Sequence, residues 1–179
     1  DHARRIRALM APLGAGTAAA APELYSALGV TLPTGQGLAS YYANLHRDWD
    51  WGVAENEAAY RLVDAALGAA PPGRTLLLGA GAGRLAYDLH LRRGPAPLVA
   101  ADLNPLFLLA AQRLFTGEAL ELYEFPLAPR DVASHAILRK LKAPAPAAAG
   151  LHLVFADVAR APFAEGAFDT VITPWLIDV

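Results

Sequence analysis

The stretch that decides the fold is TLLLGAGAGR, residues 75–84, in which a short apolar run passes directly into a glycine-rich loop. A pattern typical of a helix begins at Arg84 and continues to about Arg92. In α/β proteins, a buried strand that ends in glycines and leads into a helix brings backbone N–H groups close to a ligand. The sequence therefore predicts a strand–loop–helix unit at residues 75–92.

Two kinds of segment alternate after this loop, short apolar runs of strand length and longer helical patterns. The expected strands lie at 98–101, 151–156 and 170–177, and a helix is expected at 105–115. Each of these three strands is followed or closed by an aspartate, namely Asp102, Asp157 and Asp178. Short buried strands that alternate with helices predict an α/β domain with a parallel sheet and right-handed crossovers.

The chain divides near residue 70, where Pro-Pro-Gly at 71–73 ends a helical pattern. Residues 1–70 are interpreted as an N-terminal extension and helical cap, with a helical patch at 22–28 and a helix over about 54–68. Residues 71–179 are expected to form the domain that carries the glycine loop.

One connection in this domain is long. Residues 116–150 separate the second expected helix from the third expected strand, and they include a helix expected at 131–142 and an Ala/Pro-rich tract. A connection of this length in a compact domain is usually functional or mobile.

Composition excludes several classes of protein. Hydrophobic residues make up 55% of the 179 residues, charged residues make up 18%, and the net charge is −2. A core of ordinary size is therefore expected, and bulk electrostatics gives no sign of a nucleic-acid partner. The absence of cysteine excludes disulfides and thiolate chemistry, and the five histidines show no metal-ligand spacing, so no metal is expected. No apolar run reaches bilayer length, so we expect no membrane partner and a cytoplasmic protein.

The glycine loop has a pattern of its own. Gly79, Gly81 and Gly83 occupy alternate positions, Ala80 stands between the first two, and Arg84 follows the last. A dinucleotide-binding loop needs its third glycine at position 84, where this chain has arginine. The alternating form suits a ligand with an amino-acid moiety, whose carboxylate meets backbone N–H groups and a nearby arginine.

Two acidic residues extend this pattern. Asp102 follows Gly83 by 19 residues, which is the spacing at which a carboxylate holds two ribose hydroxyls. Taken alone, Asp102 is equally consistent with an N-cap or a turn residue before the helix. Asp157 suits an adenine amino group, or it is a polar residue at a strand end. Because the loop and both aspartates fall at carboxyl ends of strands, together they favour an adenosyl ligand.

These motifs resemble the Rossmann-like (class I) S-adenosylmethionine-dependent methyltransferases, in particular the carnosine N-methyltransferase family. The matching stretches are 79–86, 102–109, 161–178 and, upstream, 47–49 and 55–57. The resemblance covers about residues 41–179. It departs from the family at Asp102, where the family usually has Glu, and after Asp178, where the family continues with Thr-Ala.

The resemblance implies S-adenosylmethionine as the cofactor and a small-molecule methyl acceptor, an imidazole nitrogen of a histidine-containing dipeptide or a similar amine. Further donor contacts are expected from residues next to the strand ends: Leu103, Asn104, Val158 and Thr173. Asp178 is the expected catalytic carboxylate, because a hydrogen bond to one imidazole nitrogen leaves the other nucleophilic. The alternative is that Asp178 caps a helix. Tyr41, Tyr42 and Trp49 line the pocket or pack in the core.

Three functions are therefore open: a small-molecule N-methyltransferase, a non-catalytic adenosyl-binding or interaction domain, and a nicotinamide-dependent oxidoreductase, which Arg84 disfavours. The resemblance also implies a seven-stranded sheet, of which four strands are expected here. The domain is accordingly expected to be incomplete at its C-terminus, with an exposed apolar edge along 170–177.

Overall fold

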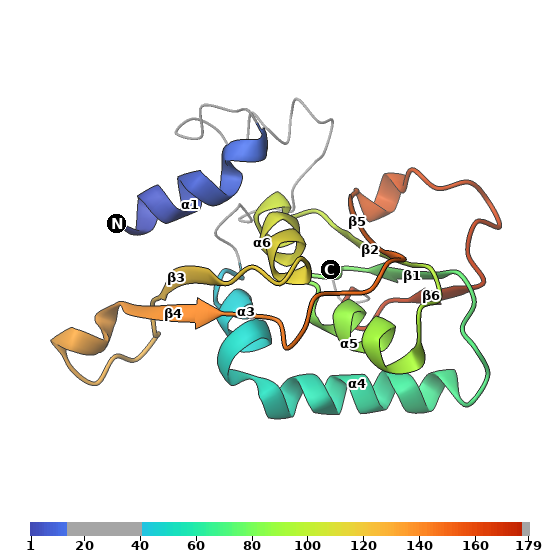
Figure 1. Cartoon of the computed structure of the whole chain (residues 1–179), viewed down its shortest axis with the longest axis horizontal. Coiled ribbons are helices and arrows are strands. Elements are labelled where there is room, and N and C mark those ends of the chain that lie inside the picture. The colour runs from blue at the N-terminus through green and yellow to red at the C-terminus, as the bar shows by residue number, and fades with distance from the viewer. Residues whose placement is uncertain (14–40, 177–179) are drawn as a thin grey trace.

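The computed structural model describes residues 1–13 and 41–176 (Figure 1). The helical patch expected at 22–28 and the Asp178 carboxylate lie outside these residues. The helices are α1 His2–Met10, α3 Ala43–His46, α4 Val53–Leu67, α5 Arg84–Arg93 and α6 Pro105–Phe115, with short turns η1 Ala11–Leu13, η2 Arg47–Trp51, η3 Val132–His135 and η4 Val158–Arg160. The strands are β1 Thr75–Leu78, β2 Leu98–Asp102, β3 Leu120–Glu124, β4 Ile137–Leu141, β5 Leu151–Phe155 and β6 Thr170–Ile172.

Four of the strands form one parallel sheet in the order β5-β2-β1-β6. In the register of this sheet, Leu77 of β1 lies opposite Ala100 of β2 on one side and Ile172 of β6 on the other. Asp102 at the end of β2 lies opposite Phe155 of β5. The α/β class with a parallel sheet, predicted from the alternation of strand and helix patterns, is confirmed.

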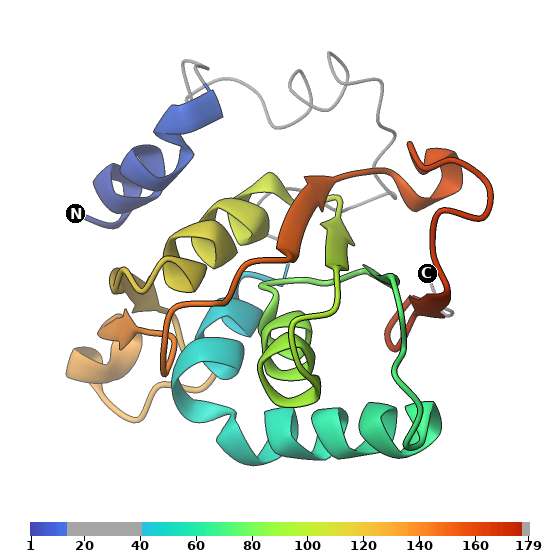
Figure 2. The ribbon, with the colours of Figure 1, turned by 45° about the vertical axis from the view of Figure 1, so that its right-hand side comes forward.

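Helices cover one face of this sheet, as Figure 2 shows for α4, α5 and α6. On that face, Leu77 and Ala100 pack with Tyr60 of α4 and Ala86 of α5 in one hydrophobic cluster. Neither alanine is exposed at all, and such small side chains let the helices approach the strands closely. On the opposite face, the segment between β5 and β6 packs against Leu76 and Ala101, while Val171 of β6 is 56% exposed.

An aromatic pair anchors the segment that covers this second face. Phe163 and Phe168 meet edge to face with their ring centroids 5.1 Å apart, and they pack against Leu76 and Ala101. Asp169 directly precedes β6, and it accepts hydrogen bonds from the backbone and side chain of Arg74, which directly precedes β1. The arginine lowers the pKa of Asp169 to about 2. The entry to β6 is thus tied to the entry to β1.

A second sheet replaces the helix expected at 131–142. β3 and β4 pair antiparallel, with Leu122 opposite Arg139, and only the single turn η3 is helical within that range. The helix prediction is wrong because side chains of β4 alternate between core and solvent, and β3 supplies the pairing partner. Leu141, for example, is fully buried in the core while Lys140 is exposed.

The fourth expected strand is shorter than predicted. β6 ends at Ile172, and residues 173–176 form a turn instead of continuing to 177. Pro174 explains the early end, because proline lacks the N–H that a strand needs for its ladder. Trp175 is consequently 64% exposed.

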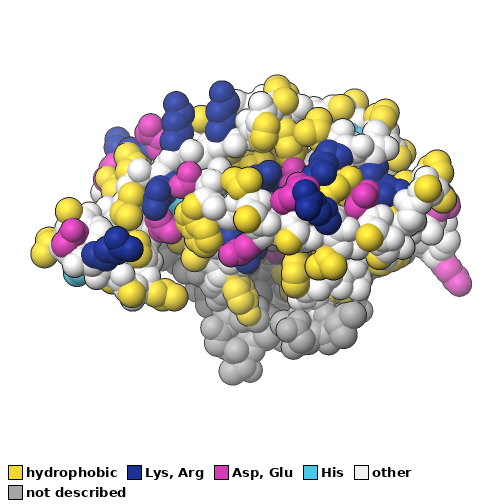
Figure 3. Space-filling model, turned by 90° about the horizontal axis from the view of Figure 1, so that it is seen from below, with side chains coloured by type: hydrophobic (Ala, Val, Ile, Leu, Met, Phe, Trp, Pro, Cys, Tyr) yellow, Lys and Arg dark blue, Asp and Glu magenta, His cyan; other side chains and the backbone are white. Residues whose placement is uncertain are grey.

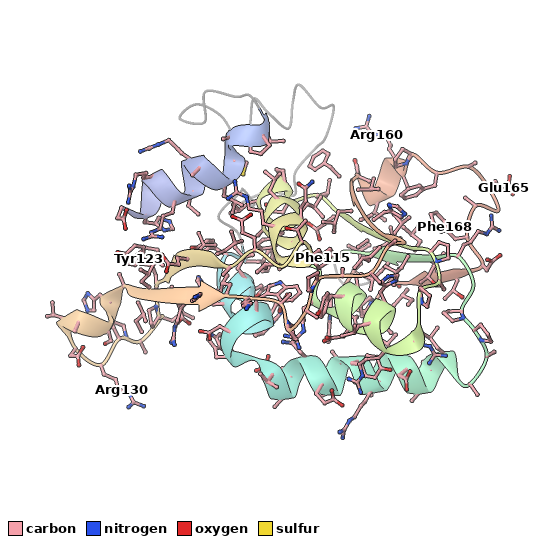
Figure 4. The ribbon with its side chains drawn as sticks, in the orientation of Figure 1. Phe115, Tyr123, Arg130, Arg160, Glu165 and Phe168 are labelled. Atoms are coloured by element: carbon pink, nitrogen blue, oxygen red, sulfur yellow. The ribbon has the colours of Figure 1, made fainter. Side chains whose placement is uncertain are left out.

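The N-terminal helices share a hydrophobic core with the sheet domain. Leu9 of α1, Leu45 of α3 and Trp49 of η2 pack in one cluster with Tyr87 of α5 and Phe115 of α6. Figure 4 places Phe115 at the centre of the molecule, between these elements. Among the helices that the structure describes, none is long and apolar enough to cross a bilayer.

Candidate functional site

The glycine loop at residues 79–83 has backbone conformations that residues other than glycine rarely adopt. Gly79, Gly81 and Gly83 all have positive φ angles, +65°, +56° and +80°. At Gly83 an added Cβ would lie 2.9 Å from Cζ of Phe115, so glycine is needed there for space as well. At Gly81 an added Cβ would meet nothing within 4 Å. The described residues leave this side of the loop open, so that a ligand can approach the backbone there.

Asp102 fixes the middle of the loop to the end of β2. Its Oδ2 accepts the backbone N–H of Gly81 at 2.7 Å, and its Oδ1 accepts the N–H of Asn104 at 2.7 Å. Burial raises the pKa of Asp102, and the hydrogen bonds from Asn104, Gly81 and Leu103 oppose that shift. The neighbouring N–H of Ala80 donates to a β2 carbonyl as well. The carboxylate lies at the loop, where the sequence predicted a ribose contact.

The helix cap that follows is a different residue. Asn104 is the N-cap of α6, and its side chain accepts the N–H of Leu106 at 3.0 Å. The capping role left open for Asp102 therefore belongs to Asn104, whereas the turn role fits Asp102, whose side chain accepts the N–H two residues further on. The backbone N–H groups of Leu103 and Asn104 both donate to Asp102, and the contacts expected between these two residues and the methyl donor stay a prediction.

Arg84 begins α5, and its guanidinium contacts the N-terminal segment. Its Nε donates to Asp88 at 2.8 Å, and its Nη1 donates to the backbone carbonyl of Asp48 at 2.8 Å. The guanidinium also lies 5.4 Å from the ring centroid of Trp49. Burial raises the pKa of Asp88, and the charge of Arg84 opposes that rise. Arg84 thus joins α5 to η2, and the ligand role that the sequence predicts for it stays a prediction.

Trp49 supports the glycine loop through a contact that the sequence analysis did not predict. Its indole Nε1 donates to the carbonyl of Ala82 in the glycine loop at 2.9 Å, and the side chain is buried. Of the three aromatic residues considered for the pocket, Tyr42 and Trp49 pack in or against the core, and Tyr41 is 59% exposed. No sequence signal reveals the Trp49 contact, because 33 residues separate the two partners.

The remaining predicted residues also lie at the carboxyl edge of the sheet. The N–H of Ala156 donates to the carbonyl of Asp102 at 3.1 Å, so Asp157 and Val158 follow directly beside the end of β2. The Asp157 side chain is mostly buried and pairs with Arg160 at 3.8 Å. Thr173 follows β6, and a Cβ at Gly79 would lie 3.3 Å from Leu176 in the same turn. In Figure 4, Arg160 marks this end of the segment that leads on to Phe168.

The charges elsewhere form no patch of one sign on the face seen in Figure 3. On α4, Glu57 pairs with both Arg61 and Arg92, at 2.7 and 2.6 Å. Within residues 1–13 and 41–176, no three His, Asp or Glu side chains are grouped to hold a metal ion.

No protein-family model matches the sequence, and no curated protein matches it. The assignment of the site therefore depends on its geometry and on the motifs themselves.

Proposed function

We propose that this chain binds S-adenosylmethionine as a Rossmann-like methyltransferase domain and transfers its methyl group to a nitrogen of a small molecule. The observation that carries the proposal is the position of the glycine loop. It follows β1, which has β2 on one side and β6 on the other, so the strand order reverses there. Open α/β sheets bind ligands at such a switch point, beyond the carboxyl ends of the strands.

The charge at the loop favours this ligand over a dinucleotide. The Asp102 carboxylate already occupies the N–H of Gly81, and the N–H of Gly83 donates to the carbonyl of Ala80. In this arrangement of the loop, neither N–H group is available to the diphosphate of a dinucleotide. A sulfonium carries positive charge, which this carboxylate attracts. The arginine at position 84, where a dinucleotide loop has glycine, supports the same choice.

Each contact to the donor follows from the residues at this edge. The two oxygens of Asp102 keep lone pairs beyond the bonds from Gly81 and Asn104, and these accept the ribose hydroxyls. Asp157 and Val158, next to the end of β2, meet the adenine. The amino-acid moiety lies against the backbone at Gly81, where the described residues leave space, and it does not use the Gly81 N–H, which Asp102 holds.

The methyl donor, when bound, would supply a methyl carbon: the nitrogen lone pair of the acceptor forms the new bond, and the electron pair of the broken carbon–sulfur bond stays on sulfur as a neutral thioether. The protein positions the two reactants in line, which contributes about 7–11 kcal/mol when the geometry is good. We assign Asp178 to the acceptor. Its carboxylate accepts the N–H of an acceptor imidazole, and this leaves the other ring nitrogen with its lone pair free to attack.

The experiment is a radiolabel transfer assay with S-adenosylmethionine and carnosine, combined with a screen of small histidine-containing and amine acceptors. Transfer to a ring nitrogen supports the proposal. Binding of the donor without transfer to any acceptor would identify the chain as a non-catalytic adenosyl-binding domain instead.

A further inference from the structure

We infer that Trp49 is a positioning residue for the glycine loop, and that the N-terminal segment 47–51 thereby controls how tightly the donor binds. The ligand in this inference rests on the proposed function, whereas the effect on the loop does not. Three contacts carry the inference, and they all run from η2 to the loop or to the first residue of α5.

The first contact is the hydrogen bond from the Trp49 indole to the Ala82 carbonyl, at 2.9 Å. Trp49 is 4% exposed, and its ring meets those of Tyr87 and Phe115 edge to face, at 5.4 and 6.1 Å between centroids. The ring therefore has one orientation, and its N–H is the group that satisfies the Ala82 carbonyl. A buried carbonyl that loses its hydrogen-bond donor destabilises the folded state by its full desolvation free energy.

The second and third contacts pass through Arg84. It donates to the Asp48 carbonyl and lies over the Trp49 ring. The Asp48 carbonyl also accepts the side chain of Asn56 at 3.0 Å. Residues 47–51 form a π-helix, in which the N–H of Gly52 donates to the Arg47 carbonyl. π-helical turns are rare in proteins, and those that occur are frequently found at functional sites.

The loop is consequently held from two sides. Asp102 holds the N–H of Gly81 from the end of β2, and Trp49 holds the carbonyl of Ala82 from the N-terminal segment. The first bond fixes the 80–81 peptide and the second fixes the 82–83 peptide, on either side of Gly81, where an added Cβ would meet no described atom within 4 Å. Loss of the indole N–H of Trp49 would let the 82–83 peptide turn. S-adenosylmethionine would then bind to a loop that must first be ordered.

The chain contains a matched control for this role. Trp51, on the same π-helix, also donates one indole hydrogen bond at 2.9 Å, to the Glu124 carboxylate in the hairpin. Trp51 is 48% exposed, and no contact links it to the loop. Trp49→Phe and Trp51→Phe therefore each remove one indole donor and keep an aromatic ring. Only the first change reaches the loop.

We would measure hydrogen exchange of the amides at 79–86, the KM for S-adenosylmethionine and kcat. We expect Trp49→Phe to accelerate exchange and to raise KM about three- to tenfold with kcat changed less than twofold. Trp51→Phe should leave all three unchanged. Equal effects of both variants, or a fall in kcat without a change in KM, would overturn the inference.

Two further measurements keep the test decisive. If Trp49→Phe does not fold, the indole N–H of Trp49 in the wild-type chain should exchange far more slowly than those of Trp51 and Trp175. Rapid exchange of that proton would also overturn the inference. If the wild-type chain binds no S-adenosylmethionine, the proposed function fails, and the comparison of amide exchange still decides the role of Trp49.

Discussion

The Asp102 carboxylate accepts the backbone N–H of Gly81 at 2.7 Å and so joins the end of β2 to the middle of the loop after β1. This bond gives one side chain two tasks. It sets the backbone at the open side of the loop, and it leaves lone pairs for the hydroxyls of a ligand. Both tasks require the charged carboxylate, although burial alone raises the pKa of Asp102.

Asp102→Ala should therefore weaken S-adenosylmethionine binding by roughly 1–3 kcal/mol, because ribose hydroxyls lose a charged acceptor. Calorimetric titration measures this directly. Asp131→Ala is a suitable control, since it removes a carboxylate that caps η3 in the β3–β4 connection. Unchanged affinity in Asp102→Ala would refute the ribose role.

Two glycine variants separate the stability of the loop from its ligand binding. Gly83→Ala places a methyl group 2.9 Å from Phe115 at a φ of +80°, so we expect the free energy of unfolding to fall by about 2–4 kcal/mol. Gly81→Ala meets only the strain of a positive φ, about 1–2 kcal/mol, but its methyl group points to the open side.

Denaturant unfolding and donor titration of the two variants test this pair. Gly81→Ala should lose more binding than stability, whereas Gly83→Ala should lose stability first. The reverse order would show that the ligand does not approach the loop at Gly81.

How much of this arrangement is predictable depends on sequence distance. The strand, glycine loop and helix at 75–92 are local, so periodicity and turn chemistry reveal them. The place of Asp102 follows from spacing, since a strand end fixes it. The hydrogen bond from Arg84 to the Asp48 carbonyl joins residues that are 36 positions apart, so no periodic pattern in the sequence reveals it.

The hairpin shows the same limit. Five residues of β4 alternate between core and solvent, which is too short a pattern to exclude a helix. What decides for a strand is the pairing with β3, which tertiary structure supplies. Pro174 is a different case, because its missing N–H is visible in the sequence, yet the strand predicted over 170–177 runs through it and overlooks this signal for the end of β6.

A buried histidine makes stability depend on pH. His46 is fully buried, and neither of its ring nitrogens has a hydrogen-bond partner of ordinary geometry among the described residues. Burial lowers the pKa of His46, with a smaller lowering by Arg139, while Glu124, the Tyr123 carbonyl and Asp50 oppose the shift.

The unfolded chain therefore binds more protons at His46 than the folded chain does, once the pH falls below 6.5. Stability should decrease as the pH falls from 6.5 through the lowered pKa, and His46→Leu should flatten this dependence. Urea unfolding at several pH values between 5 and 7.5 gives the comparison. A slope in His46→Leu equal to that of the wild-type chain would contradict the assignment.

Asp178→Asn tests the acceptor side of the site. We expect donor affinity to change little and kcat to fall by at least tenfold, because an amide is a weaker acceptor for an imidazole N–H than a carboxylate. Titration and turnover on the same preparation give both values. Equal losses in the two would place Asp178 in the donor site or in the fold.

The central claim is that the loop and Asp102 bind an adenosyl ligand with an amino-acid moiety. Isothermal titration of the wild-type chain with S-adenosylhomocysteine, and separately with NAD, tests it most directly. We predict one S-adenosylhomocysteine bound per chain, an affinity reduced in Asp102→Ala, and no heat of binding with NAD. A folded chain that binds NAD and not S-adenosylhomocysteine, or that binds neither, would contradict the account.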